Sequence, residues 1–414
     1  MTIDRRGLLK GTALAAATPA LGAAIRPARA QGAALKIGVL TDMSSLYTDL
    51  SGAGSVLGTR MATEDFLAAN PGLNIEIVSA DHQNKPDVGS NIARQWFDRD
   101  GVDVIIDVPN SAVALAVNQI TREKNKVFLD SGAASTDLTG PQCSPNLVHW
   151  TYDTYMLANG TAGAMVAAGG DSWFFITADY AFGHALERDT GAFVTKAGGK
   201  VLGQVRTPFP GTTDFSAFLV QAQASRAKVI GLANAGGDTI NCIKQAAEFG
   251  ITKRGQKLAG LLVFITDVHA LGLATAQGLN LTESFYWDLN DSTRAFAAKF
   301  HPRNRGVRPT MVHAGCYAAT LHYLKAVTAL GAAQAKANGA GVVAKMKEMP
   351  TDDPLFGKGS IRADGRKIHP AYLFEVKSPA ESKGPWDYYK LVREIPADKA
   401  FRPLADGNCP LVRG

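Results

Sequence analysis

The sequence predicts an α/β protein made of two doubly wound parallel-sheet lobes. Short apolar, β-branched segments alternate with segments whose apolar residues have helical spacing. The same alternation starts again after a turn-rich stretch at residues 132–145. With residues 1–30 set aside as a signal, 384 of the 414 residues remain. That length exceeds what one hydrophobic core usually supports, so we expect two domains.

The first 30 residues have the pattern of an export signal. Arg5 and Arg6 precede an uncharged run at 11–25, shorter than the roughly 20 apolar residues that span a bilayer. Residues 28–30 read Ala-Arg-Ala, which a signal peptidase accepts. Paired arginines at this place are the address of the bacterial twin-arginine route. We therefore predict a signal peptide at 1–30 and a periplasmic mature chain from about Gln31, rather than the N-terminal helix of a cytosolic protein.

Removing this segment changes the charge of the chain. The whole sequence has 43 basic and 37 acidic residues, a net charge of +6. Residues 1–30 hold five basic residues and one acidic residue, which leaves 38 against 36, or +2. This near-neutral balance argues against nucleic acid or a membrane surface as a direct partner. No later apolar stretch is long enough to cross a bilayer.

In the first half, strands and helices follow one another directly. Each predicted strand is a short apolar run, and the first helix ends at a Pro-Gly pair, 71–72. This βαβ order implies a parallel sheet with helices on both faces. The predicted strands are 35–40, 73–79, 102–108 and 126–130, and the predicted helices are 54–70, 88–99 and 112–125.

The second half repeats this order and then departs from it. The predicted helices are 153–168, 185–197, 215–225 and 238–249, and the strands are 172–177, 200–206, 228–233, 257–263 and 285–287. Two helices, 292–303 and 309–331, then follow with no strand between them. A strand and turn at 361–366 precede a hairpin with arms 371–376 and 386–393. Such a tail is explained if the chain crosses back between the lobes.

The cysteines and histidines match no metal or catalytic motif. Cys143 and Cys409 lie in loop-like, Pro-flanked sequence, and an oxidising compartment permits a disulfide between them. Cys242 and Cys316 lie in helical patterns, where a buried free thiol is the default. There is no nucleophile elbow, phosphate loop or His-Glu-x-x-His pair. We expect no enzyme activity, no cofactor and no metal.

The loops after the strands are the expected place for a ligand. In open α/β sheets, ligands bind beyond the carboxyl ends of the strands, and helix N-termini favour a carboxylate there. Ser111, at the start of a helix, suits either an N-cap or a ligand donor. Residues 131–136 supply hydroxyls and small side chains, which suit either ligand contact or closure of a turn.

Five segments carry a resemblance to a known family. They are Leu-Lys-Ile-Gly-Val-Leu at 35–40, Gly52 with Gly54, Asp-Val-Pro-Asn-Ser at 107–111, Asp-Ser-Gly-Ala-Ala-Ser at 130–135 and Thr-Ala-Asp-Tyr-Ala-Phe-Gly at 177–183. In this order and spacing, the chain resembles the branched-chain-amino-acid type of periplasmic binding protein of ABC importers. The resemblance covers essentially the whole mature chain.

The resemblance implies a type I fold whose two lobes, joined by a three-strand hinge, close on a ligand. It implies one lobe at 35–150 plus 289–350, a second at 151–288 plus 351–395, and a C-terminal tail at 396–414. It also implies a permease and an ATPase as partners, with the membrane reached only through the permease. We expect the binding protein itself to be a monomer.

The resemblance also suggests ligand contacts. Ser111 and the segment from Ala133 to Ser135 match carboxylate-holding positions, and Tyr180 matches a position that often contacts the ligand. Trp150 and Tyr152 border a crossover, where packing is at least as good an explanation. The full set of candidates is Tyr47, Asn110, Ser111, Ser131, Ala133, Ala134, Ser135, Tyr180, Asn234 and Asp267.

The ligand stays open at this point. An amino acid needs an acceptor for its ammonium group, and Asp267 is the leading candidate, although it could equally cap a helix that starts at Val268. The sequence has no clear counterpart of the acidic residue that amino-acid binders usually place there. An aromatic or keto acid is therefore an option, as are an amide or urea. A sensor that presents its ligand to a membrane protein is an alternative function on the same fold.

Overall fold

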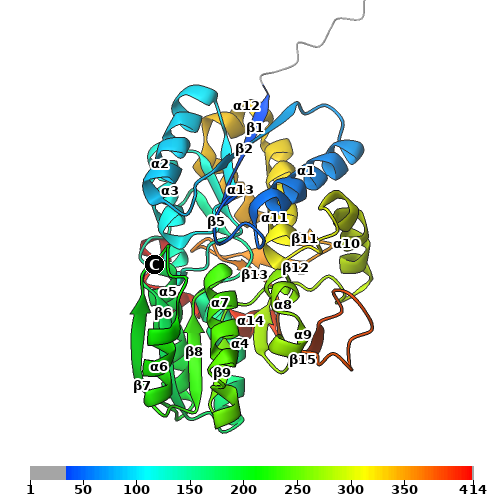
Figure 1. The fold of residues 1–414 in the computed structure, drawn as a ribbon. Helices are drawn as coiled ribbons and strands as arrows, with labels where there is room; N and C mark the ends of the chain where they lie inside the picture. Colours follow the sequence, from blue (N-terminus) through cyan, green and yellow to red (C-terminus); the bar gives the residue numbers. More distant parts are fainter. Residues whose placement is uncertain (1–33, 413–414) are drawn as a thin grey trace, which may run out of the picture. The chain divides into compact units, whose positions relative to one another are not determined.

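The computed structural model of this chain describes residues 34–412 (Figure 1). The predicted signal at 1–30 lies outside these residues. Two parallel sheets, each covered by helices, form the frame of the described chain. The α/β class with two doubly wound lobes is therefore confirmed. We call the lobe around the first sheet the first lobe and that around the second sheet the second lobe.

The first sheet has five parallel strands in the order β2-β1-β3-β4-β5. Gly38 of β1 pairs with Val78 on one side and Ile105 on the other, so β1 lies inside the sheet. Its glycine leaves room for the ring of Trp96. The strands are β1 (Leu35–Thr41), β2 (Ile75–Asp81), β3 (Val104–Asp107), β4 (Val127–Asp130) and β5 (Leu147–His149).

Helices cover both faces of this sheet. Two of them, α1 and α11, come from distant parts of the sequence and pack closely, because Gly58 of α1 lies against the backbone of His313. Tyr317 of α11 also donates a hydrogen bond to Asp65 of α1, 2.8 Å away. The helices of this region are α1 (Gly52–Ala69), α2 (Pro86–Gln95), α3 (Ser111–Glu123), α10 (Asp291–Arg303), α11 (Met311–Leu330), α12 (Ala332–Ala337) and α13 (Gly339–Glu348).

The second sheet has four parallel strands in the order β7-β6-β8-β9. Its two central strands are apolar except for Ser172 and Thr177, and every residue in them but Ser172 is buried, as expected of a doubly wound sheet. The strands are β6 (Ser172–Ala178), β7 (Lys200–Thr207), β8 (Val229–Ala233) and β9 (Lys257–Gly260). The helices around them are α4 (Thr154–Ala167), α5 (Ala181–Lys196), α6 (Ser216–Ala224), α7 (Gly237–Glu248), α8 (Ile265–Leu271) and α9 (Leu273–Ala276).

Two small antiparallel sheets contain the remaining strands. The predicted hairpin is confirmed as β14 (Ala371–Val376) and β15 (Tyr389–Ile395), and β10 (Asn280–Glu283) pairs with β14. The strand predicted at 285–287 is wrong, because pairing with β14 ends at Glu283. The aromatic side chains that suggested a strand there pack instead, Tyr286 against Phe374 and Tyr389. The other sheet consists of β11 (Thr351–Asp353), β12 (Gly357–Ile361) and β13 (Lys367–Ile368).

Two segments that connect the lobes lie side by side. The backbone of His149 donates to Gly365 at 2.9 Å, and the Arg366 guanidinium donates to the Tyr152 carbonyl at 2.9 Å. A third connection, 284–290, leads from β10 to α10. Arg366 is fully buried and lies 3.7 Å from the Asp153 carboxylate. The connecting region therefore holds an internal ion pair rather than a loose linker.

The C-terminal segment returns to the first lobe. It begins with the short helix α14 (Ala397–Ala400). Cys143 and Cys409 form a disulfide, with Cα atoms 5.6 Å apart, so the candidate bridge is confirmed. Arg402 donates to the Thr136 carbonyl at 3.0 Å. Cys242 and Cys316 are buried free thiols, as predicted.

Candidate functional site

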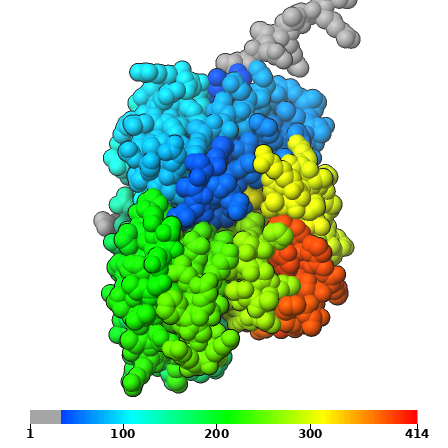
Figure 2. Space-filling view, viewed as in Figure 1, coloured from blue at the N-terminus to red at the C-terminus, as the bar shows by residue number. Residues whose placement is uncertain are grey.

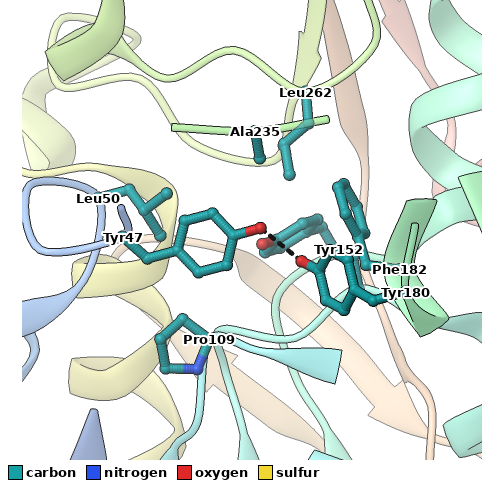
Figure 3. A pocket seen from close by; sticks show the side chains of 9 residues that line it. Tyr47, Leu50, Pro109, Tyr152, Tyr180, Phe182, Ala235 and Leu262 are labelled. Carbon is teal, nitrogen blue, oxygen red and sulfur yellow. Dashed lines mark hydrogen bonds between the residues drawn. The ribbon is translucent and has the colours of Figure 1, made fainter. Parts of the chain in front are cut away.

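A small cavity lies where the two parallel sheets direct the carboxyl ends of their strands (Figure 3). The space between its lining residues is about 210 Å³, part of which is open to solvent. Six of its nine lining residues have apolar side chains, and the other three are tyrosines. Its lining residues are Tyr47, Leu50, Pro109 and Ala134 from the first lobe, Tyr152 from a connecting segment, and Tyr180, Phe182, Ala235 and Leu262 from the second lobe.

Two tyrosines meet across this cavity. The hydroxyls of Tyr47 and Tyr180 are hydrogen-bonded to each other (Figure 3). The Phe209 ring stacks on Tyr180 with 3.9 Å between centroids and also lies 5.9 Å from the Tyr47 ring. Burial raises the pKa of both tyrosines, so both phenols stay neutral and can donate as well as accept hydrogen bonds. The pair gives the cavity an aromatic wall with polar tips.

The polar loops of the first lobe bind one another. Asn110 caps α3, because its side-chain oxygen accepts from the backbone of Ala112 at 2.9 Å and of Val113 at 3.1 Å. Ser111 is therefore the first helical residue rather than the N-cap. Its hydroxyl oxygen accepts from the backbone amides of Ala134 at 3.3 Å and Ser135 at 3.2 Å. The β3–α3 loop thus holds the loop after β4.

Two buried carboxylates, at the ends of β3 and β4, accept hydrogen bonds from these loops and from the start of α1. Asp130 accepts from the amides of Gly132 at 3.2 Å and Ala133 at 2.9 Å. Asp107 accepts from the Ser51 hydroxyl at 2.5 Å, and burial raises its pKa to about 6. Asp107 has φ +86°, in the left-handed region where non-glycine residues are strained. The first lobe therefore keeps a strained strand end in place at the cavity.

The second lobe approaches the first through the β8–α7 loop. The Gly237 amide donates to the Leu46 carbonyl at 3.2 Å. Gly236 has φ +56°, and a side chain there would clash with the Leu46 carbonyl and the Tyr47 ring. In Figure 2 the dark-blue surface of the first lobe meets the green surface of the second lobe. This contact needs glycine for both its conformation and its space.

Asn234 and Asp267 are buried behind this contact. Asn234 accepts from the Thr239 hydroxyl at 2.7 Å, while its side-chain nitrogen has no partner among residues 34–412. Asp267 accepts from the Phe264 amide at 2.9 Å, and burial raises its pKa to about 7. It lies in the first turn of α8, which begins at Ile265 and not at Val268. Asp267 thus has a helix-capping partner, and it faces a groove beside Leu46 rather than the cavity.

Asp238 is a residue that the sequence interpretation missed. It lies in the first turn of α7, is fully buried and has a pKa raised by burial to about 7. Burial is the largest cause of the raised pKa of Tyr47 and Tyr180, and the charge of Asp238 raises both further. The available signal was an acidic residue directly after the Gly236-Gly237 pair at a strand end.

Three of the ten candidate residues line the cavity, namely Tyr47, Ala134 and Tyr180. Ser111, Ala133 and Ser135 lie behind Ala134 in the same loops, whereas Asn110, Ser131, Asn234 and Asp267 are buried outside the wall. The wall residues that sequence reasoning did not select are mostly apolar. Phe182 could have been found two positions after Tyr180, but nothing local marks Leu50, Pro109 or Leu262.

No helix within residues 34–412 has the length and apolarity to cross a membrane. No curated protein matches the chain. A family of sequences described as periplasmic binding proteins matches residues 34–385.

Solved structures agree with this family. A periplasmic binding protein from Burkholderia mallei is 50% identical, with a TM-score of 0.88 over 92% of this chain and 99% of its own. A branched-chain amino acid ABC transporter periplasmic ligand-binding protein from Burkholderia xenovorans is 40% identical, with a TM-score of 0.79 over 91% and 99%. An ABC transporter solute-binding protein from Rhodopseudomonas palustris, in complex with benzoate, is 22% identical, with a TM-score of 0.78 over 88% and 97%. This chain therefore belongs to the periplasmic binding protein family, as a solute-binding protein of an ABC transporter.

Proposed function

We propose that this protein captures a small carboxylate-bearing solute between its two lobes and delivers it to the permease and ATPase of an importer. The observation that supports this most is the cavity itself, whose wall is shared between strand-end loops of both lobes. A ligand that contacts both walls stabilises the closed arrangement relative to an open one. The lobes would divide as 35–150 with 289–350 and 151–288 with 351–395, and the protein would act as a monomer.

The first lobe suits the carboxylate. Ala134 lines the cavity, and its amide and that of Ser135 point to the Ser111 oxygen. The Ser111 hydroxyl accepts both of these bonds and keeps its own proton to donate. The start of α3 adds the positive end of a helix dipole, which favours an anion. We place the carboxylate of the ligand against these groups.

The remaining wall suits an apolar or aromatic body. Leu50, Pro109 and Leu262 present aliphatic surface, and Phe182 adds an aromatic ring. This agrees with a branched-chain or aromatic acid rather than with urea, which has no apolar part. The Burkholderia xenovorans relative is described as the ligand-binding protein of a branched-chain amino acid ABC transporter, and the Rhodopseudomonas palustris protein holds benzoate on the same fold.

A matched ligand panel tests the ligand class. Thermal shift and calorimetry would compare L-leucine, 4-methylpentanoate, 4-methyl-2-oxopentanoate and benzoate with the corresponding amide, benzamide, and with urea. We expect at least one carboxylate to raise Tm, because a ligand that binds only the folded state stabilises it. Stabilisation by benzamide or urea, with none by the carboxylates, would overturn the proposal. Small-angle scattering should show a smaller radius of gyration with the active carboxylate.

The export route is a separate proposal. Arg5 and Arg6 with the Ala-Arg-Ala end at 28–30 support secretion to the periplasm by the twin-arginine route. The protein with both arginines replaced by lysine should accumulate in the cytoplasm with its first 30 residues attached. Mass spectrometry of the periplasmic fraction should find a mature N-terminus near Gln31, and normal secretion of the double variant would contradict the route.

A further inference from the structure

Two buried acids are neighbours in the first sheet. Asp107 ends β3 and Asp130 ends β4, and the two residues lie opposite each other in the register of these parallel strands. Both are fully buried. One oxygen of each carboxylate, Oδ1 of Asp107 and Oδ2 of Asp130, has no hydrogen-bond partner among residues 34–412. Adjacent buried acids with unused acceptors need an explanation, because an unpaired buried charge costs stability.

No lysine or arginine within residues 34–412 forms an ion pair with either acid. The buried Arg366 lies 3.7 Å from the carboxylate of Asp153, which is also buried. His149 lies 3.4 Å from Asp130, but its Nε2 is bonded at 2.9 Å to the Ala133 carbonyl, which can only accept. Burial lowers the pKa of His149 well below its ordinary value, so the ring is neutral. This region therefore has three buried acids and one buried cation.

The other groups that face Asp107 are neutral. At the start of α1, the Ser51 hydroxyl donates to Asp107 at 2.5 Å. In α11, burial raises the pKa of the Cys316 thiol well above its ordinary value. In a connecting segment, the Tyr152 hydroxyl donates to a backbone carbonyl at 2.6 Å, and burial raises its pKa as well. Between β3, β4 and the elements packed on them, a change of charge therefore falls on Asp107 or Asp130.

Short segments join these two acids to the cavity wall. Asp130 accepts from the Ala133 amide at 2.9 Å, and Ala134, the next residue, lines the cavity. Asp107 is two residues before Pro109, which also lines the cavity. A ligand carboxylate bound at this wall therefore adds a negative charge near both acids. A nearby like charge favours the protonated form of a buried acid.

Building on the proposed function, we propose that Asp107 and Asp130 form a proton-binding site, and that Asp107 takes up a proton when the ligand carboxylate binds. The ligand enters as an anion, and one proton moves from solvent to an oxygen of Asp107. The net charge of the region then stays the same. Capture is favoured in a more acidic medium, and release is favoured in a more alkaline one.

The pKa of Asp107 sets the pH range of this effect. Burial raises it from 3.8 to about 6, although the Ser51 hydroxyl opposes the shift. Burial, and to a smaller extent the charge of Asp107, raise the pKa of Asp130 well above its ordinary value, so Asp130 stays protonated. At pH 7, Asp107 is therefore mostly ionised in the free protein. Affinity should rise from pH 8 to pH 6 and level off below pH 6, where Asp107 is protonated before binding.

Calorimetry measures the proton uptake directly. Binding at pH 7 would be compared in phosphate and in Tris, whose ionisation enthalpies differ, for each of benzoate, 4-methylpentanoate, 4-methyl-2-oxopentanoate and L-leucine that binds. None of these acids gains or loses a proton between pH 6 and pH 8. We expect uptake of about 0.5 proton, and about threefold or more tighter binding at pH 6 than at pH 8. Asp107→Asn keeps the size of the side chain and should reduce the uptake to below about 0.1 proton.

Asp103→Asn is the matched control. Asp103 is a buried acid just before the other end of β3, and it pairs with Lys126 at 3.3 Å and Lys336 at 2.6 Å. This variant should keep both the proton uptake and the pH dependence. If Asp107→Asn does not fold, infrared difference spectra of the wild-type protein replace it, and binding should add the C=O stretch of one protonated carboxyl group.

The outcomes separate this inference from the proposed function. Binding of an acid with no proton uptake, no added carboxyl band, or an uptake that Asp107→Asn leaves unchanged would overturn only the proton-binding site. If none of the four acids binds, the carboxylate proposal fails together with this one.

Discussion

The two walls of the cavity differ in how their polar groups are held. In the first lobe, the polar loops bind one another: Ser111 holds two amides, Asp130 holds two more, and Asn110 caps α3. In the second lobe, the wall is aromatic and apolar, and the buried acid behind it has no partner. The first-lobe wall is prearranged by internal hydrogen bonds. In the second lobe, the oxygens of the buried Asp238 make no hydrogen bond within residues 34–412.

This difference indicates that the two walls contribute differently to ligand binding. A prearranged wall loses little conformational entropy when it binds, so it suits a group common to many ligands, such as a carboxylate. A wall whose buried polar groups have no partner can discriminate between ligands. A ligand that does not form hydrogen bonds with these groups leaves them unpaired and binds more weakly. The predictions below test this contrast, starting with the largest expected effect.

The unpaired acid should make stability depend on pH. Burial raises the pKa of Asp238 from 3.8 to about 7, so the folded state holds this proton more tightly than the unfolded state. The ionised Asp238 therefore lowers the free energy of unfolding. This loss is absent below pH 4, grows between pH 4 and pH 7, and stays constant above pH 7. Asp238→Asn removes the charge and should be more stable than wild type at pH 8 by up to about 4 kcal/mol, with little difference at pH 4. Denaturant unfolding at the two pH values measures this, with the exposed Asp398→Asn as control; an equal difference at both would contradict it.

The disulfide should stabilise the first lobe without changing recognition. Cys143 and Cys409 are 266 residues apart, so their bond restricts the unfolded chain strongly. Replacing both by serine should lower the free energy of unfolding by about 3 kcal/mol. The affinity for the active acid, measured at 25 °C on folded protein, should change less than threefold. A large loss of affinity would show that the first wall depends on this bond for its arrangement.

The contact between the walls should tolerate no side chain at Gly236. Gly236→Ala adds a methyl group that clashes with the Leu46 carbonyl and the Tyr47 ring. We expect about hundredfold weaker binding, or about 2.7 kcal/mol. Gly250→Ala is the matched control, because Gly250 has φ +65° but open space around it. If both variants bind equally well, the contact plays no part in closure.

A change to both walls together should have the smallest effect. Ser111→Ala with Tyr180→Ala removes the hydroxyl that holds the Ala134 amide behind the first wall and an aromatic ring from the second. Affinity for the active acid should fall by about tenfold or more, roughly 1.4 kcal/mol. Titration calorimetry of the double variant and both single variants would show whether the losses add. Unaltered affinity in the double variant would refute the placement of the site.

Local patterns predicted most elements but not those that depend on distant pairing. Residues 35–40 and 228–233 are apolar enough to predict strands, and β1 and β8 lie there. The strand β10, Asn-Leu-Thr-Glu, has weak strand propensity and forms because β14, about 90 residues later, pairs with it. In the same way, α8 starts three residues before its prediction because the Asp267 side chain reaches back to the Phe264 amide.

The site was harder to predict for a similar reason. Strand-end loops identified Tyr47, Ala134 and Tyr180, because parallel sheets collect ligands at that edge. Asp238 resembles any acidic residue in a first helical turn, where it is common on exposed helices. Its burial depends on the β8–α7 loop meeting Leu46, about 190 residues earlier in the chain. Periodicity within one segment carries no information about such a contact.

The disulfide also sets an order for maturation of the chain. A ribosome produces Cys143 first, then Cys242 and Cys316, and Cys409 last. Oxidation of thiols in their order of synthesis would join Cys143 to Cys242, which is a buried free thiol in the folded protein. The native pair therefore requires that α7 and α11 shield their thiols before oxidation, or that a wrong bond is exchanged afterwards. On the first of these routes, folding of both lobes precedes the last covalent step.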